Sequence, residues 1–259
     1  MSKKAIFEEA PISRRKALTD AGMILGATAL AMLPAAAGGQ QHSKNENAKQ
    51  PRFPWGYKKI DPEKAGQIAY EKYFKGECSF AAASGILIPL QEEIGEPYSS
   101  LPLDAFKFGH SGVVGWGTTC GTLIGAGIAT AFIAGENGEQ ILNEVIKWYT
   151  NTSLPNFKPS NPKATIHTES VSHSPLCHIS VGRWMKKARV TDYRSDPRKE
   201  RCARLAGRVA KQTVIILNKW ADGNLGKITK SHSAIAAFGL PAQNNCSDCH
   251  NQAAPSFAK

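Results

Sequence analysis

Residues 196–221, with the sequence DPRKERCARLAGRVAKQTVIILNKWA, form the clearest helical pattern in the chain. Asp196 is a typical N-cap residue before Pro197, and Gly223 follows the last turn as a helix stop signal. Apolar side chains recur at the spacing of one helix face, and these residues are Cys202, Leu205, Val209, Ile216 and Trp220. The pattern predicts a helix from Pro197 to about Ala221 with one buried face.

The chain on both sides of this segment also favours helices. Asp61 followed by proline starts a helix that Gly76 ends, and a further helix covers Gln140 to Tyr149. Residues 151–176 are expected to be mostly loop, because they contain Pro155, Pro159, Pro162 and Pro175. Strand signals are weak throughout. We therefore predict a mainly α fold, a single domain of packed helices with long loops, over residues 58–259.

Residues 113–135 contain no charged side chain. Their 23 residues are enough to span a bilayer, which takes about 20 apolar residues in a helix. However, glycine and threonine are frequent in the first half of the segment, which is typical of close helix packing. We predict a buried, closely packed segment rather than a membrane span.

The N-terminus resembles an export signal over residues 1–37. A basic region with Arg14-Arg15 precedes an apolar run, and Ala35-Ala36-Ala37 offers a cleavage site. Adjacent arginines favour a twin-arginine signal over an ordinary secretory signal or an uncleaved anchor. Residues 38–57 are polar and are predicted to form a linker. The expected location is the periplasm.

The chain is basic, with a formal net charge of +11, and 42% of its residues are hydrophobic. That hydrophobic fraction excludes a disordered chain. The basic residues are spread along the sequence, which favours contact with an acidic redox partner or an anionic membrane surface. Nucleic acid is a poor match for a protein with an export signal.

The C-terminal residues 246–250 read Cys-Ser-Asp-Cys-His, the CxxCH spacing of covalent haem attachment. Cys246 and Cys249 can add to the two vinyl groups of haem, and His250 can then bind the iron. A zinc half-site would need a second ligand pair, and a redox CxxC would need a βαβ context. Neither context is visible, so we predict one haem c per chain.

The second axial ligand of this haem can be narrowed by counting. Of four methionines, only Met185 lies beyond the signal segment, so a His/Met haem depends on that residue alone. The other histidines are His42, His110, His167, His173, His178 and His232. We therefore expect bis-His ligation, with His110 and His232 as the leading candidates for the distal ligand.

Four cysteines remain outside the haem motif, namely Cys78, Cys120, Cys177 and Cys202. In an exported protein they could form two disulfides, or they could hold one iron–sulfur cluster. Twin-arginine export carries folded proteins, which suits a cluster assembled before export. Spacing alone does not choose between these two alternatives.

Several segments around these cysteines resemble the split-Soret cytochromes c, members of a wider group of redox-active proteins with a C…GCAxxG…C…C pattern. The segments are Phe108-Gly109-His110, Gly115 to Gly121, Ser174-Pro175-Leu176-Cys177-His178, Trp184, and Arg201 to Leu205. The resemblance implies a mainly α homodimer with bis-His haems near the subunit interface. It also implies an iron–sulfur cluster held by Cys78, Cys120, Cys177 and Cys202.

Two features of this chain depart from the family pattern. Thr119-Cys120-Gly121 replaces Gly-Cys-Ala, and the next glycine is Gly125, one position late. The family resemblance also implies two haems, whereas this chain has one CxxCH motif. We expect an electron-transfer protein, because bis-His ligation leaves no open iron position. The alternative is a haem or iron–sulfur reductase acting on a small molecule.

Overall fold

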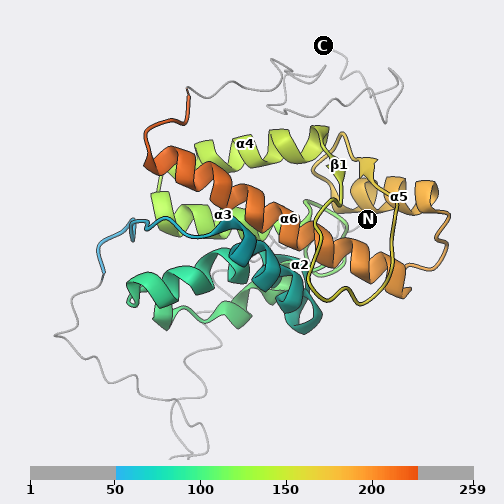
Figure 1. The fold of residues 1–259 in the computed structure, drawn as a ribbon, viewed down its shortest axis with the longest axis horizontal. Helices are drawn as coiled ribbons and strands as arrows, with labels where there is room; N and C mark the ends of the chain where they lie inside the picture. The colour runs from blue at the N-terminus through green and yellow to red at the C-terminus, as the bar shows by residue number, and fades with distance from the viewer. Residues whose placement is uncertain (1–50, 227–259) are drawn as a thin grey trace, which may run out of the picture. The chain divides into compact units, whose positions relative to one another are not determined.

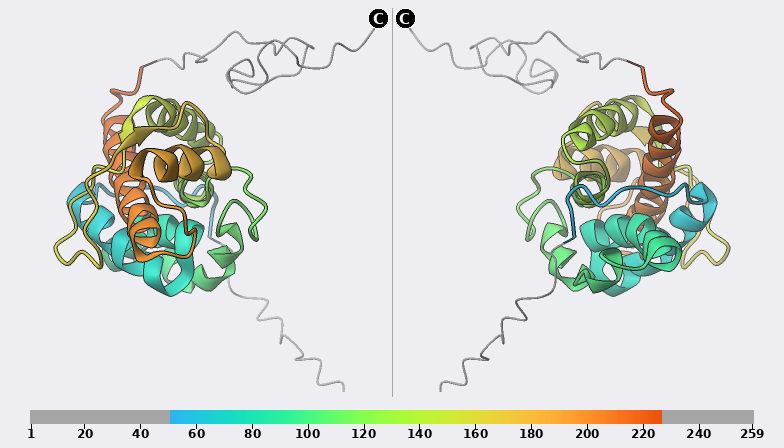
Figure 2. Two further views of the ribbon diagram at one scale, coloured as in Figure 1. Left: turned by 90° about the vertical axis from the view of Figure 1, so that its right-hand side faces the viewer. Right: turned by 90° about the vertical axis from the view of Figure 1, so that its left-hand side faces the viewer.

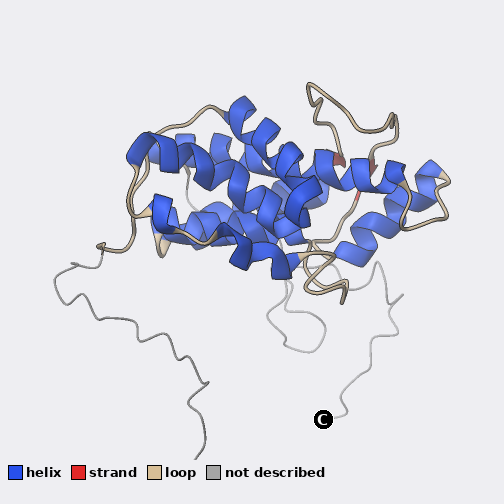
Figure 3. Cartoon of the chain, turned by 90° about the horizontal axis from the view of Figure 1, so that it is seen from below, coloured by secondary structure: helices blue, strands red, loops and turns tan. Residues whose placement is uncertain are grey.

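A computed structural model describes residues 51–226. Helices dominate this part of the chain, and strands are limited to two short pieces (Figures 1 and 3). The elements are α2 (Pro62–Ile94), η1 (Tyr98–Ser100), η2 (Leu103–Gly109), α3 (Gly121–Ala134), α4 (Asn137–Asn151), β1 (Ser153–Leu154), β2 (Ser170–Val171), α5 (Cys177–Ala188) and α6 (Asp196–Ala221). The mainly α prediction is confirmed. The export signal, His232 and the haem motif lie outside the described residues.

Helix α2 folds back on itself at Gly76 and Glu77. Both residues have non-helical dihedral angles, and Glu77 has a positive φ of 59°. Lys64 and Glu92 form an ion pair of 2.5 Å, although 28 residues of straight helix would separate them by about 42 Å. The element is therefore a helical hairpin, and the predicted end of the first helix at Gly76 is its bend.

The start of α2 follows the sequence prediction. The Asp61 side chain accepts a hydrogen bond of 2.8 Å from the backbone N–H of Glu63, with Pro62 in the first helical position. This is the expected N-cap arrangement, because the first N–H groups of a helix have no partner within it.

Helix α6 packs along α2 and buries the predicted face except at Trp220, which is partly buried (Figure 1). The two helices approach closely at Gly66 and Gly207, where a Cβ on Gly207 would lie 2.8 Å from the carbonyl oxygen of Gly66. One boundary differs from the prediction. Asp196 is the first helical residue and Ser195 is the N-cap, without a capping hydrogen bond from its side chain.

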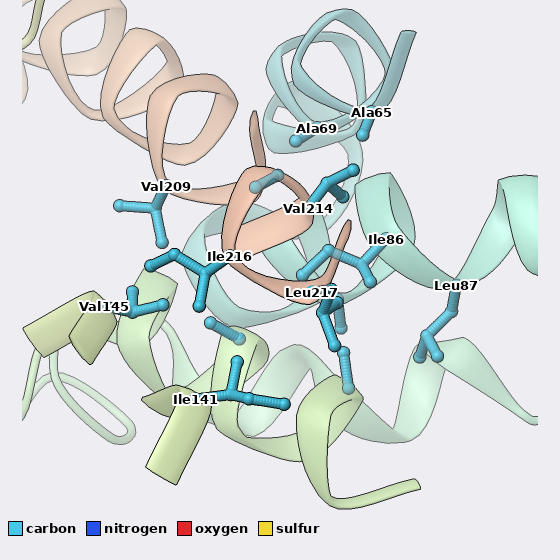
Figure 4. Packing of buried hydrophobic residues seen from close by; sticks show 14 of the residues in the cluster. Ala65, Ala69, Ile86, Leu87, Ile141, Val145, Val209, Val214, Ile216 and Leu217 are labelled. Carbon is cyan, nitrogen blue, oxygen red and sulfur yellow. The ribbon is translucent and has the colours of Figure 1, made fainter. Parts of the chain in front are cut away.

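The main core lies where α6 meets α2, α3 and α4. Figure 4 shows apolar side chains from the two halves of α2, from α4 and from α6 converging. Its labelled members are Ala65, Ala69, Ile86, Leu87, Ile141, Val145, Val209, Val214, Ile216 and Leu217. Burial of such side chains contributes roughly 1.5–3 kcal/mol each, which offsets the loss of chain entropy.

The uncharged segment 113–135 divides into two parts. Residues 121–134 form α3, which is mostly buried, as expected. The part before α3 is a loop, and it exposes Val114 and Trp116, so the prediction of a buried segment is wrong there. Within residues 51–226, no helix is both long and apolar enough to cross a membrane.

The ordered fold also begins earlier than the sequence indicated. Trp55 lies in the predicted linker, yet its ring stacks on Phe132 at 4.5 Å, and its backbone N–H donates to the Phe132 carbonyl. Tyr57 donates a hydrogen bond of 2.8 Å to Asn218 on α6. The polar composition of the segment concealed these two aromatic anchors.

The connection between α4 and α5 is the long loop that its prolines predicted. It is pinned by the antiparallel pairing of β1 with β2, two residues each. Helix α5, which follows at Cys177, was not predicted. Its buried stripe contains only a few side chains, among them Val181 and Trp184, so its hydrophobic pattern is short.

A glycine-to-alanine pair on α3 tests how closely α3 packs on α2. A Cβ at Gly125 would lie 2.2 Å from the Ser79 carbonyl oxygen, so Gly125→Ala should force the helices apart. We expect a loss of about 2 kcal/mol, or roughly 5 °C in Tm by circular dichroism. Gly127→Ala is the control, because its Cβ meets only the flexible end of Leu142. Equal Tm values would contradict the close contact.

Candidate redox centre

Two of the four cysteines are placed side by side by a short backbone pairing. Thr119 and Leu176 form an isolated antiparallel bridge. The N–H of Cys120 bonds to the Pro175 carbonyl at 2.8 Å, and the N–H of Cys177 bonds to the Thr118 carbonyl at 2.6 Å. Cys120 is the N-cap of α3 and Cys177 is the first residue of α5. The two thiols therefore sit at neighbouring helix N-termini.

Cys78 joins them from the bend of α2. It is the first residue after the non-helical Gly76 and Glu77, so it also begins a helical segment. A Cβ at Gly121 would lie 2.6 Å from the Cβ of Cys78 and 2.0 Å from the Gly109 carbonyl oxygen. Only glycine permits this approach of α3 to α2.

The glycines of α3 account for the departure from the family pattern. Gly121 and Gly125 are four residues apart, so they lie on one face of the helix. A Cβ at Gly125 would meet the backbone of α2, and a Cβ at Gly121 would meet Cys78 of α2 and Gly109, the last residue of η2. A glycine at position 125 thus meets the packing requirement in this chain.

Cys202 reaches the same place from the first half of α6. It belongs to one buried packing cluster with Cys78 and Cys177. In the left view of Figure 2, α5 and the beginning of α6 face the viewer, beside the bend of α2 and the loop before α3. All four cysteines are buried free thiols. The structure thus brings together the cysteines that the family resemblance grouped, and no disulfide joins them.

Burial raises the pKa of the Cys78 thiol well above its usual value, and negative charge on Cys202 and Cys120 would raise it further. Burial likewise raises the pKa of Cys177 to about 12, with Cys120 and Cys202 adding to the rise. The thiols interact because they lie close together in a medium of low dielectric constant. Without a metal, these two cysteines are protonated at neutral pH.

Two buried arginines supply positive charge beside the thiols. The Arg201 side chain is 1% exposed, and its Nη1 lies 3.6 Å from the sulfur of Cys202. Its Nη2 donates to the Ser180 hydroxyl at 2.6 Å. Arg198 is 7% exposed and donates to the Tyr73 hydroxyl at 3.3 Å. Both arginines favour thiolate over thiol at this place.

The donor set fits an iron–sulfur cluster. Soft thiolates bind zinc, copper(I) and iron–sulfur clusters. Four thiolates beside two guanidinium groups leave a net negative charge, which a cationic iron–sulfur core can balance. The Nε of Arg201 is buried with no hydrogen-bond partner, so this guanidinium has an unused donor. Within residues 51–226, however, no group of three or more His, Cys, Asp or Glu side chains is arranged so that it could hold a metal ion, so the thiols lie near one another without forming a ligand geometry.

The two arginines could not be singled out from residue type, because charged side chains are usually exposed. The spacing contains the signal, since Arg198 precedes Cys202 by four residues and Arg201 precedes Leu205 by four. Residues four apart share a helix face, so both arginines belong to the buried stripe. Glu200 is also fully buried, and it accepts a hydrogen bond of 2.6 Å from Arg204.

Of the predicted haem ligands, only His110 belongs to the residues that the structure describes. His110 follows η2, and its Nδ1 lies 3.6 Å from a carboxylate oxygen of Glu77. His110 is thus near Cys78 and stays a prediction as a distal ligand. His232, Cys246, Cys249 and His250 lie outside the described residues.

Comparison with known proteins identifies the family to which the chain belongs. Residues 80–216 match the family model "Putative redox-active protein (C_GCAxxG_C_C)". The chain is 33% identical over 204 residues to the split-Soret cytochrome c of Desulfovibrio desulfuricans, covering 76% of this chain and 71% of that protein. The chain belongs to the split-Soret cytochrome c family. The family match includes Cys120, Cys177 and Cys202 but begins after Cys78.

The family membership extends to the fold. A solved structure of split-Soret cytochrome c from Desulfovibrio desulfuricans, described as having a novel iron centre, matches with a TM-score of 0.65. The sequences are 31% identical in this comparison, which covers 79% of this chain and 86% of the other. This split-Soret family member is therefore a redox protein with the same helical domain.

Proposed function

We propose that this chain is an exported c-type cytochrome that carries electrons through a covalent haem and a cysteine-held iron–sulfur cluster. Cys246 and Cys249 attach the haem, and His250 is one axial ligand. Cys78, Cys120, Cys177 and Cys202 hold the cluster. The observation that carries the proposal is the convergence of four buried, free cysteines beside Arg201 in a chain that also contains CxxCH.

The residues of the chain have distinct tasks in this function. The haem and the cluster, when bound, supply one-electron redox chemistry. The cysteines fix the cluster among packed helices, and burial keeps water away from it. Arg198 and Arg201 offset thiolate charge, which raises the reduction potential relative to a site without cations. The chain needs no acid, base or nucleophile for this task.

The remaining assignments are part of the same proposal. Bis-His ligation follows from the shortage of methionine, and one CxxCH motif gives one haem c per chain. The family resemblance supports a homodimer. The signal at residues 1–37 supports twin-arginine export to the periplasm, and the charge of +11 supports an acidic redox partner or contact with a membrane surface.

The test is a metal and haem analysis of the purified mature protein. We expect one covalent haem per chain by mass spectrometry and pyridine haemochrome, with iron in excess of haem and acid-labile sulfide present. Iron equal to haem, without sulfide, would refute the cluster. Two haems per chain would refute the single-haem assignment. Carbon monoxide binding to the resting ferrous protein would favour a reductase over an electron carrier.

A further inference from the structure

His178 is held in an orientation that prepares it to bind a metal. Its Nδ1 lies 2.8 Å from the carbonyl oxygen of Gly117. A carbonyl oxygen can only accept a hydrogen bond, so Nδ1 carries the proton and the lone pair is on Nε2. Histidine ligands of metals commonly donate their other ring N–H to a carbonyl or carboxylate, which fixes tautomer and ring orientation. The imidazole is exposed to solvent.

The backbone behind His178 is closely packed. Its own N–H also bonds to the Gly117 carbonyl, at 3.3 Å. A Cβ at Gly117, where φ is +70°, would lie 3.2 Å from the Cβ of His178. The Gly117 carbonyl thus contacts both the backbone N–H and the ring of His178, and glycine suits position 117 because of its positive φ.

The loop beside His178 exposes apolar side chains that the described fold leaves uncovered. Trp116 is 82% exposed and Val114 is 60% exposed. Val113 and Val114 both have positive φ, which β-branched residues rarely adopt and which costs about 1–3 kcal/mol each. This strained loop therefore presents an apolar surface, and it leads directly into Gly117, whose carbonyl contacts the His178 ring. A porphyrin ring is a flat apolar group with an iron that binds such a nitrogen.

We propose that His178 is the distal axial ligand of the haem attached at residues 246–250, with the Val114 and Trp116 surface against the porphyrin. This inference rests on the proposed function, since it requires the haem. Between Gly226 and Cys246 the chain has 20 residue steps, which can span up to about 66 Å. The haem can therefore reach His178 of its own chain or of a second copy.

The assignment also explains why a cysteine and a histidine are adjacent here. Cys177 points into the buried cysteine cluster, whereas the next side chain is exposed. Neighbouring residues would thus provide one ligand to each redox centre, joined by a single peptide unit. Transfer of one electron along this path would oxidise one centre and reduce the other by one electron, without transfer of a proton or an atom.

Among the other described histidines, His110 is the one that the sequence analysis favoured as distal ligand. Its Nδ1 lies 3.6 Å from Glu77, beyond hydrogen-bonding distance, so no contact fixes its tautomer. The side chain is 40% exposed. The fixed tautomer therefore favours His178 over His110.

The test compares His178→Ala, His110→Ala and His232→Ala in the haem-loaded mature protein by electron paramagnetic resonance and visible spectroscopy. We expect His178→Ala to convert ferric haem from low spin to high spin almost completely. Added imidazole should restore the low-spin spectrum, and the ferrous form should bind carbon monoxide. His167→Ala, at an exposed loop histidine, is the matched control and should stay low-spin.

The outcomes separate this inference from the proposed function. A low-spin His178→Ala protein with normal haem content would overturn the ligand assignment alone, as would conversion by His110→Ala or His232→Ala instead. A wild-type protein without covalent haem would overturn the proposed function and this inference together. Because His178 is exposed, its alanine variant is expected to keep the wild-type Tm, which checks that the fold is intact.

Discussion

Replacing Cys78 by alanine is expected to remove the cluster and leave the haem in place. The iron-to-haem ratio should fall to one, and acid-labile sulfide should disappear. The reason is geometric, because Cys78 is the only thiol that reaches the site from α2, and its backbone lies against the N-terminus of α3. A cluster that loses one of four thiolates at a buried position also gains an open, reactive iron.

The Cys78 variant is informative because the family match begins at residue 80. The inclusion of Cys78 in the site therefore depends on its packing with Cys177 and Cys202. Ser79→Ala is a matched control, since the Ser79 hydroxyl is buried beside the site and has no hydrogen-bond partner. Loss of that hydroxyl should leave the iron and sulfide contents unchanged, and the Tm should be unchanged or slightly higher.

A Cys78→Ala protein with full sulfide content would mean that three cysteines suffice. In that case the fourth position would be taken by another ligand. Loss of haem as well as cluster would show instead that the variant fails to mature, and Cys202→Ala would then separate the two effects. Cys202 belongs to α6, so its replacement changes no residue in the bend of α2.

Much of the fold could be predicted because local signals dominate it. The Asp61 cap, the break at Gly76 and the buried stripe of α6 are all readable from residue type and spacing. Helix α5 could not be predicted so easily, since it is short and buries only a few side chains. Its start at Cys177 depends on the long-range pairing with Thr118, which no local pattern encodes.

The proximity of the four thiols was predictable, and their surroundings were not. Counting cysteines and recognising the family segments grouped four thiols that the structure places near one another, and their role as ligands stays a prediction. The partners of those thiols depend on tertiary packing, as the buried Arg198 and Arg201 illustrate. Charged residues are expected at a surface unless they are paired, so composition alone placed these two outside. The buried face of α6 therefore carries charged side chains as well as apolar ones.

Replacing Arg201 is expected to have the second large effect. Whether the replacement stabilises or harms the protein depends on whether the cluster is bound. The guanidinium is fully buried, and among the residues that the structure describes no carboxylate is in salt-bridge contact with it. Burial acts to lower the pKa of Arg201, but negative charge at Cys202, Tyr149 and Cys120 outweighs it, so the pKa is raised. Without thiolates, the same cation is buried with hydroxyl and carbonyl partners only, which is costly.

Replacing Arg201 by methionine should therefore have opposite effects on the two forms of the protein. In cluster-free protein the change removes an uncompensated buried charge, and we expect the free energy of unfolding to rise by about 1–2 kcal/mol. In the protein with its cluster bound, the change removes the cation beside the thiolates. The reduction potential of the cluster should therefore fall, and a chelator should remove its iron faster. Chemical denaturation and potentiometry measure these two quantities.

Arg201→Lys is the control that separates charge from packing. Lysine keeps the positive charge and loses the planar fork that reaches both Cys202 and Ser180. If Arg201 compensates thiolate charge, the reduction potential of the cluster should be closer to the wild-type value in the lysine variant than in the methionine variant. If both variants destabilise the cluster-free protein and leave the potential unchanged, Arg201 serves α6 packing through Ser180, and the compensation argument fails. The opposite signs are the decisive feature, because a residue that only supports packing would destabilise both forms when it is replaced.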